Sequence, residues 1–80
     1  MSMNENEIIK IIAKTLNIAE SSINMDSSAD NVDEWDSLGH LGVLVALDKA
    51  FDGKLAGIPA MATADSVSKI FSVLKENSFI

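Results

Sequence analysis

The chain lacks cysteine and arginine, and its 80 residues include only one proline and one tryptophan. Without cysteine it has no disulfide framework and no thiolate ligands for a metal. Twelve acids outnumber six lysines, which gives a net charge of −6. This balance argues against nucleic-acid binding, because that function needs cationic groups that displace counterions from phosphates.

The first five residues also lack the basic and apolar regions of a signal peptide. No apolar run approaches the length of a membrane span. We therefore expect a soluble, cytoplasmic protein without membrane insertion. Residues 1–80 are long enough for a single small domain of modest stability, which buries about 60–65% of its unfolded surface.

The acidic residues are concentrated in one stretch. Six acids and no lysine lie between Glu20 and Asp36, whereas the rest of the chain has six acids and six lysines. This stretch therefore carries the whole net charge. A solvated loop is the simplest interpretation. The alternative is a docking surface for basic partners, which would raise association rates and select partners.

Hydrophobic periodicity predicts an all-α protein, a small bundle of three main helices plus a short fourth. The first helix is predicted over 4–16, where Asn4 and Glu7 fit a capping box and Asn17 is the stop. A long loop over 17–36 follows, and such a loop needs pinning residues or a function. The predicted pinning residues are Ile18, Ile23, Met25 and Val32.

The second helix is predicted over 37–51, with Asp36 as its N-cap. A short helical turn is expected after Pro59, because proline is favoured at the first helical position. The last helix is predicted over 64–76, with Thr63 as its cap.

Residues 26–37 have acids at the spacing of a calcium-binding EF-hand loop, but the pattern fails at its decisive positions. The sixth position is Asn31 instead of glycine, and the twelfth is Ser37 instead of glutamate. We therefore expect no metal site.

A serine hydrolase is a second chemistry to consider, since Ser37 and His40 are three residues apart on a predicted helix. Nothing in the sequence supplies an oxyanion hole or a substrate pocket, so we expect no enzymatic activity. His40 is most simply a surface histidine. The alternative places it close to a group attached to Ser37.

The run from Glu34 to Leu41 turns from an acidic loop into an apolar helix. Serine at a helix start is usually a capping residue, but Asp36 already supplies a cap and leaves the Ser37 hydroxyl free. A helix start favours an attached anion, because its N–H groups are unpaired and its dipole end is positive. Trp35 is interpreted as a packing residue that covers the loop.

These residues suggest a family. The start Asp36-Ser37-Leu38 and the end Ala46-Leu47-Asp48-Lys49-Ala50-Phe51-Asp52 of the second helix closely resemble acyl carrier proteins. The resemblance covers nearly the whole chain, from the Ile-rich first helix to the segment that opens with Thr63-Ala64-Asp65-Ser66-Val67. The version Trp35-Asp36-Ser37-Leu38-Gly39-His40 resembles stand-alone carriers of specialised pathways, such as surface-polysaccharide or secondary-metabolite assembly.

The resemblance implies a carrier that is not itself an enzyme. A phosphopantetheinyl transferase (holo-carrier synthase) would move 4′-phosphopantetheine from coenzyme A to Ser37 and would supply Mg²⁺ and the general base. The terminal thiol of the arm would then hold an acyl or aminoacyl group as a thioester. Partners would be an acyl-loading ligase or transferase and acyl-processing enzymes of fatty-acid-like or specialised biosynthesis. We expect a monomer. The alternative is an unmodified helical protein-interaction module with the same fold.

The resemblance also implies two sets of site residues. Partner recognition falls on Asp36, Leu38, Gly39, His40, Leu41 and Gly42. The candidate lining for an acyl chain is Leu41, Leu44, Val45, Ile58 and Met61, which alternatively form part of the core.

Carriers of primary fatty-acid synthesis resemble this chain but have several acids on the exposed face of the second helix. Here that face has Gly39, Gly42, Asp48 and Lys49. An interior glycine costs about 1 kcal/mol of helix stability relative to alanine. We predict that the two glycines leave a bare patch for close approach by partners that rely less on charge.

Overall fold

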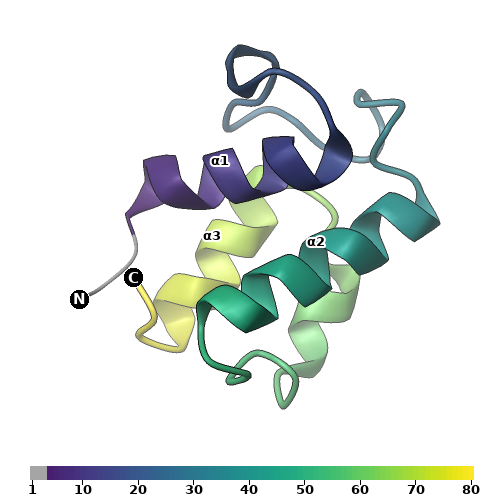
Figure 1. Cartoon of the computed structure of the whole chain (residues 1–80). Helices are drawn as coiled ribbons and strands as arrows, with labels where there is room; N and C mark the ends of the chain where they lie inside the picture. Colours follow the sequence, from purple (N-terminus) through teal and green to yellow (C-terminus); the bar gives the residue numbers. More distant parts are fainter. Residues whose placement is uncertain (1–3) are drawn as a thin grey trace.

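A computed structural model describes residues 4–80 and places three α-helices around one apolar core (Figure 1). In chain order the elements are α1 (Glu5–Leu16), the 3₁₀ helix η1 (Glu20–Ser22), α2 (Ser37–Ala50), the 3₁₀ helix η2 (Pro59–Thr63) and α3 (Val67–Glu76). Residues 4–80 contain no strand. In Figure 1, α1 and α2 cross the front of the molecule and α3 lies behind them. The predicted small helical bundle is confirmed.

The first helix, α1, begins one residue after its predicted start and ends at the predicted residue, with Asn4 and Asn17 as its caps. The Asn4 side chain accepts a hydrogen bond from the Glu7 N–H at 2.9 Å. Asn17 takes the left-handed conformation, with φ 59°, and its N–H bonds back to the carbonyl of Lys14. One face of α1 is buried, which fixes it against the core.

Helix α2 begins at Ser37, directly after its N-cap, Asp36. It ends at Ala50, one residue before the predicted end, and Phe51 is its C-cap. The Phe51 ring packs edge-on against Phe79, with ring centroids 5.3 Å apart, so the end of α2 is tied to the C-terminal segment.

The loop over 17–36 is pinned to the core, although not by every residue that the sequence suggests. Ile23 is buried, and Ile18 and Val32 are partly buried against the core. The prediction for Met25 is wrong, because its side chain is 48% exposed. It lies in a tight turn in which the buried Ser27 side chain accepts from the Asn24 N–H, and this turn directs Met25 outward.

Trp35 closes the loop just before α2. Only 1% of its surface is exposed, and it is the largest fully buried side chain. The interpretation of Trp35 as a packing residue is therefore confirmed. The other buried apolar residues of the core are Ile8, Ile12, Ala13, Leu16, Ile23, Val43, Leu47, Leu55, Met61, Ala64, Val67, Ile70, Phe71, Val73 and Leu74.

The predicted start of the last helix is wrong. Helix α3 begins at Val67, and its N-cap is Ser66, whose hydroxyl accepts from the Lys69 N–H at 3.1 Å. The cause is a tertiary contact with the 17–36 loop. The Val67 N–H bonds to the Ser27 carbonyl, and the Ala29 N–H bonds to the Asp65 carbonyl. These bonds lie on either side of Ser66, whose backbone is extended (φ −149°, ψ 159°), so the helix starts only at Val67.

No fourth α-helix forms within residues 4–80; the segment predicted to form it is the 3₁₀ helix η2. The Met61 N–H bonds to the Ile58 carbonyl, and the Ala64 N–H bonds to the Met61 carbonyl. Both bonds have the three-residue spacing of a 3₁₀ helix. The Thr63 hydroxyl, predicted as the cap of the last helix, instead donates to the Ala60 carbonyl within η2.

The corrected cap can be tested by substitution. Ser66→Ala removes the acceptor for the Lys69 N–H and should lower the free energy of unfolding by about 1 kcal/mol. Thr63→Ala is the matched control and should cost less, because Thr63 caps no α-helix. Urea unfolding followed by circular dichroism measures both. A larger loss for Thr63→Ala would contradict the assignment.

Candidate functional site

Ser37 is the first residue of α2, and its side chain is exposed. The capping bond is made by its neighbour, since the Asp36 carboxylate accepts from the Gly39 N–H at 2.8 Å. Within residues 4–80 the Ser37 hydroxyl forms no hydrogen bond with another group of the chain. A helix start with an uncommitted hydroxyl is therefore presented to solvent, next to N–H groups that favour an anion.

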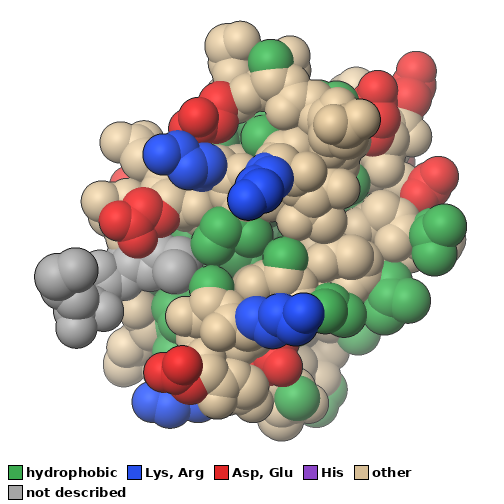
Figure 2. Space-filling view, in the orientation of Figure 1, with side chains coloured by type: hydrophobic (Ala, Val, Ile, Leu, Met, Phe, Trp, Pro, Cys, Tyr) green, Lys and Arg blue, Asp and Glu red, His purple; other side chains and the backbone are tan. Residues whose placement is uncertain are grey.

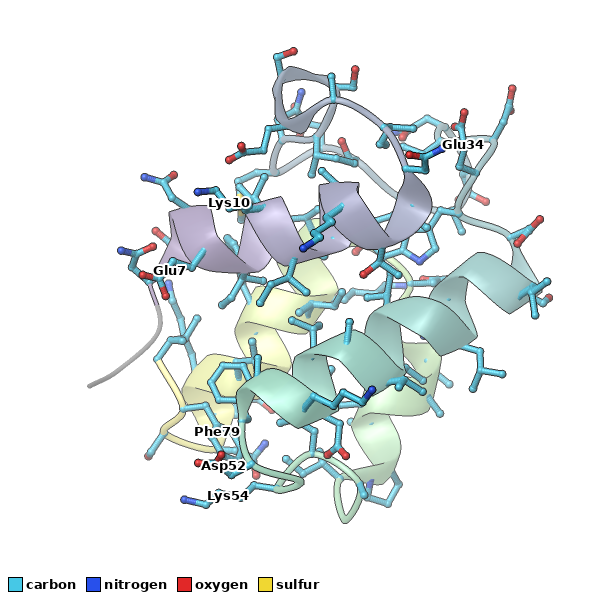
Figure 3. All side chains as sticks on the ribbon, viewed as in Figure 1. Glu7, Lys10, Glu34, Asp52, Lys54 and Phe79 are labelled. Atoms are coloured by element: carbon cyan, nitrogen blue, oxygen red, sulfur yellow. The ribbon has the colours of Figure 1, made fainter. Side chains whose placement is uncertain are left out.

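The six acids from Glu20 to Asp36 are all exposed. In Figure 2 acidic side chains gather at the upper right, over the end of the 17–36 loop and the start of α2. Figure 3 labels Glu34 in this part of the loop. Ser37 thus lies beside a negatively charged surface, which favours the approach of basic partners.

The solvent side of α2 is apolar next to Ser37. Leu38 is 76% exposed, Leu41 57% and Val45 49%. Their spacing of three and four residues puts them in one stripe along the helix. Large exposed apolar side chains that are contiguous usually mark an interaction surface.

A hollow of about 280 Å³ lies along α2 and brings together four of the five residues predicted to line an acyl chain: Leu44, Val45, Ile58 and Met61. Leu41 does not line it and instead belongs to the exposed stripe. Sequence reasoning missed Asp48, Leu55, Ala56 and Ala62, which line the hollow together with Pro59 from the expected segment 58–61. All but Asp48 come from the segment after α2, which has no periodic pattern that would have identified them.

The sequence placed Asp48 on the exposed face of α2, and this placement is wrong. It is partly buried, and its carboxylate accepts from the Leu55 and Ala56 N–H groups, both at 3.0 Å. These bonds hold the segment after α2 against the helix. The carboxylate therefore positions one wall of the hollow.

A second hollow, of about 370 Å³, lies between the end of α1 and the start of α2. Its lining includes four of the predicted partner-recognition residues, Asp36, Leu38, Gly39 and Gly42, together with Thr15, Leu16 and Glu34. Sequence reasoning did not identify the contribution of α1 to this surface.

The two glycines of α2 are explained by packing inside the chain. A Cβ on Gly39 would overlap the backbone carbonyl oxygen of Glu34 and lie 3.0 Å from a Leu16 methyl group. A Cβ on Gly42 would lie 3.1 Å from the Thr15 methyl group. The glycines thus have a role inside the chain, and the bare patch predicted for a partner stays a prediction. They let α1 and the loop approach α2 closely.

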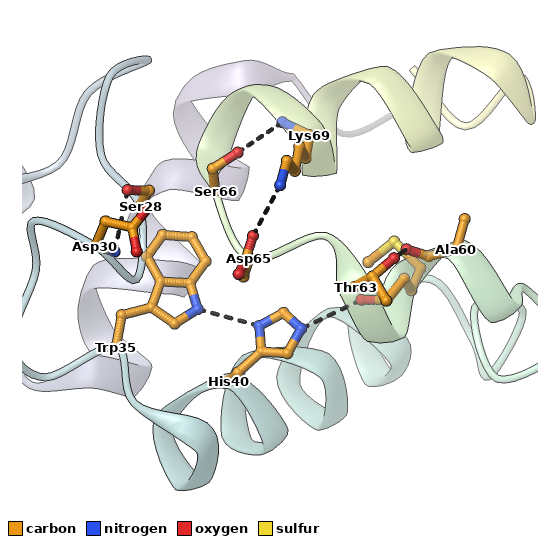
Figure 4. Close-up of polar contacts among 10 residues, drawn as sticks. Ser28, Asp30, Trp35, His40, Ala60, Thr63, Asp65, Ser66 and Lys69 are labelled. Carbon is orange, nitrogen blue, oxygen red and sulfur yellow. Dashed lines mark hydrogen bonds and ion pairs between the residues drawn. The ribbon is translucent and has the colours of Figure 1, made fainter.

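His40 is a bridging residue, which corrects its interpretation as a surface histidine. It is partly buried; the Trp35 Nε1–H donates to its Nδ1 at 3.1 Å, and its Nε2 lies 3.2 Å from the Met61 carbonyl oxygen (Figure 4). Both ring nitrogens are thus engaged away from Ser37. This geometry leaves no nitrogen to accept the Ser37 proton, as a hydrolytic pair would require.

Asp65 and Lys69 form an ion pair beside this bridge, with Oδ1 and Nζ 3.2 Å apart (Figure 4). The hydrogen bond and the charge of Lys69 lower the pKa of Asp65, and the nearby His40 adds a smaller effect in the same direction. Both partners are exposed at their side chains, so the pair contributes little to stability.

Within residues 4–80, histidine and acidic side chains do not gather in groups of three or more that could hold a metal ion. No helix of that range has the length and apolar character needed to cross a membrane.

Comparison with known proteins adds no assignment: no family model, curated protein or solved structure matches this chain.

Proposed function

We propose that this chain is a carrier of acyl intermediates, which it holds as thioesters on a 4′-phosphopantetheine arm attached to the Ser37 Oγ. The observation that carries the proposal is the exposed, uncommitted Ser37 hydroxyl at the first position of a helix that Asp36 already caps. When bound, the arm supplies a thiol that carries the acyl group. The resemblance of the sequence to acyl carrier proteins agrees with this chemistry.

The residues around Ser37 fit such a group. The unpaired N–H groups and positive dipole end of α2 stabilise a phosphodiester there. The apolar lining of the 280 Å³ hollow, with Leu44 and Met61 on opposite elements, suits an aliphatic chain. The hydroxyl is accessible to a modifying enzyme without any rearrangement of α2.

In this proposal the modification is made by a phosphopantetheinyl transferase. The Ser37 Oγ forms a bond to the coenzyme A phosphorus that carries the pantetheine group. The bond between this phosphorus and the oxygen of adenosine 3′,5′-bisphosphate breaks, and the serine proton passes to a base on the transferase. This chain contributes the nucleophile and the exposed acids of the 17–36 loop, which attract basic partners. An acyl-loading ligase or transferase and acyl-processing enzymes then use the carrier, a cytoplasmic monomer.

The decisive experiment is intact-mass measurement after incubation with coenzyme A and a broad-specificity phosphopantetheinyl transferase. We expect a gain of one phosphopantetheine group, complete loss of that gain in Ser37→Ala, and full gain in Ser68→Ala, an exposed serine on α3. No gain in the wild-type chain would contradict the proposal and favour an unmodified interaction module that uses the exposed Leu38, Leu41 and Val45 stripe.

The apolar face of α2 leads to a prediction about partners. Because Leu38, Leu41 and Val45 occupy the exposed face, partners of this carrier should depend less on charge along α2 than the general fatty-acid enzymes do. Acylation and elongation by those general enzymes should therefore be inefficient. Efficient turnover in an assay with the modified chain would contradict this expectation.

A further inference from the structure

The bridge through His40 imposes one protonation state on the ring. An indole Nε1–H can only donate a hydrogen bond, and a carbonyl oxygen can only accept one. The contacts with Trp35 and Met61 therefore require a neutral ring with a bare Nδ1 and a proton on Nε2. Trp35 is 1% exposed and Met61 3%, so water has little access to replace their hydrogen bonds with His40.

This bridge joins three separate parts of the fold. Trp35 lies near the end of the loop that precedes Ser37, and His40 lies on the first turns of α2 (Figure 4). Met61 lies in η2. Within residues 4–80, the bond from His40 to the Met61 carbonyl is the hydrogen bond that links η2 to α2. Met61 also lines the 280 Å³ hollow, so the bridge positions one wall of that hollow.

We propose that His40 is a proton-sensitive latch that holds η2 against α2 when neutral and releases it when protonated. A proton on Nδ1 would face the Trp35 Nε1–H across 3.1 Å, and two donors cannot share a hydrogen bond at that distance. The ring must then turn or withdraw. The same movement takes Nε2 away from the Met61 carbonyl, which loosens η2 and the wall of the hollow.

Two carboxylates, one on α2's N-cap and one before α3, are the acidic groups close to His40 in the fold. Asp65, from the segment before α3, interacts with His40 and is already paired with Lys69. On α2 itself, the Asp36 carboxylate lies one turn earlier and is committed to the Gly39 N–H. Asp65 is therefore a counter-charge that favours the protonated form of the His40 ring.

The test uses the unmodified chain and does not depend on the proposed function. The chain has one tryptophan and one histidine, so the side-chain NMR signals of each residue type come from a single residue. Between pH 8 and pH 5, the range in which histidine changes charge, we expect three changes with one midpoint. They are titration of the His40 ring nitrogens, a shift of the Trp35 indole N–H resonance, and shifts of the Met61 and neighbouring η2 amides in nitrogen–proton NMR spectra.

His40→Gln is the matched control. Its amide oxygen can accept from Trp35 and its amide N–H can donate to Met61, but it does not titrate. We expect the indole and η2 resonances of this variant to stay constant over the same range. Equal shifts in His40→Gln, or titration of His40 in the wild-type chain without indole and η2 shifts, would overturn the proposal.

A second measurement needs no variant. At pH 8 the ring nitrogen shifts of wild-type His40 should report a bare Nδ1 and a protonated Nε2. A neutral ring with its proton on Nδ1 would overturn the proposal even if His40→Gln failed to fold, because that tautomer cannot accept from Trp35.

Discussion

Trp35→Ala is expected to remove a large part of the chain's free energy of unfolding. Truncation of a buried tryptophan to alanine costs about 3–5 kcal/mol, and Trp35 is the largest fully buried side chain here. A domain of 80 residues has a total stability of roughly 4–12 kcal/mol. The midpoint of thermal unfolding should therefore fall by more than about 10 °C.

Far-UV circular dichroism on heating measures this effect without a tryptophan signal. Trp35→Phe is the matched control, because it keeps a large ring in the core and loses the N–H that donates to His40. Its destabilisation should be well below that of Trp35→Ala. If Trp35→Ala melted within a few degrees of the wild-type chain, the loop would not depend on Trp35 for its position.

The parts of the fold that the sequence predicts correctly are those set by nearby residues. Asn4 and Asp36 each bond to an N–H only three residues along the chain, so their capping roles can be inferred from local pattern alone. The position of Ser37 at the first turn of α2 follows from the same local rule. The position of Ser37 at the start of a capped helix was therefore identifiable from the sequence.

The start of α3 was not predictable in this way. Thr63 and Ser66 are both good capping residues, and local preference does not choose between them. The choice is made by the pairing of residues 65–67 with the loop, through the bonds from Val67 to Ser27 and from Ala29 to Asp65. A contact between segments far apart in sequence overrides the local signal.

The misassigned side chains of α2 have the same physical origin. His40 and Asp48 are polar residues on a helix, and a surface position is the usual outcome for such residues. Here the partner of His40 is the carbonyl of Met61, 21 residues away, and the partners of Asp48 are N–H groups seven and eight residues away. Periodicity places both on α2 but cannot show which segment returns to cover them.

Gly39 and Gly42 show that the sequence can locate two helix glycines correctly without revealing the contacts that require glycine there. Sequence pattern identifies them as helix-weakening positions, and a partner surface was one way to explain that cost. The structure supplies an explanation within the chain. Gly39 lies against the Glu34 carbonyl and a Leu16 methyl group, and Gly42 lies against Thr15.

Gly39→Ala should consequently destabilise the fold, although alanine is the better helix former. The new methyl group would overlap a backbone oxygen of Glu34, which cannot move as a flexible side chain does, and would also lie 3.3 Å from the capping carboxylate of Asp36. Overpacking of this kind costs about 1–3 kcal/mol. Urea unfolding should therefore show a net loss, despite the gain of up to about 1 kcal/mol in helix preference.

Two other glycines make the comparison decisive. Gly57→Ala meets no atom within 4 Å and should change stability by less than about 0.5 kcal/mol. Gly42→Ala meets only the Thr15 methyl group at 3.1 Å, so its packing cost and helix gain should nearly cancel. If Gly39 existed only to give a partner access, Gly39→Ala would stabilise the isolated chain and weaken partner binding. A loss of stability in the isolated chain, with Gly57→Ala unchanged, would instead assign Gly39 to the packing that sets the start of α2 and so the position of Ser37.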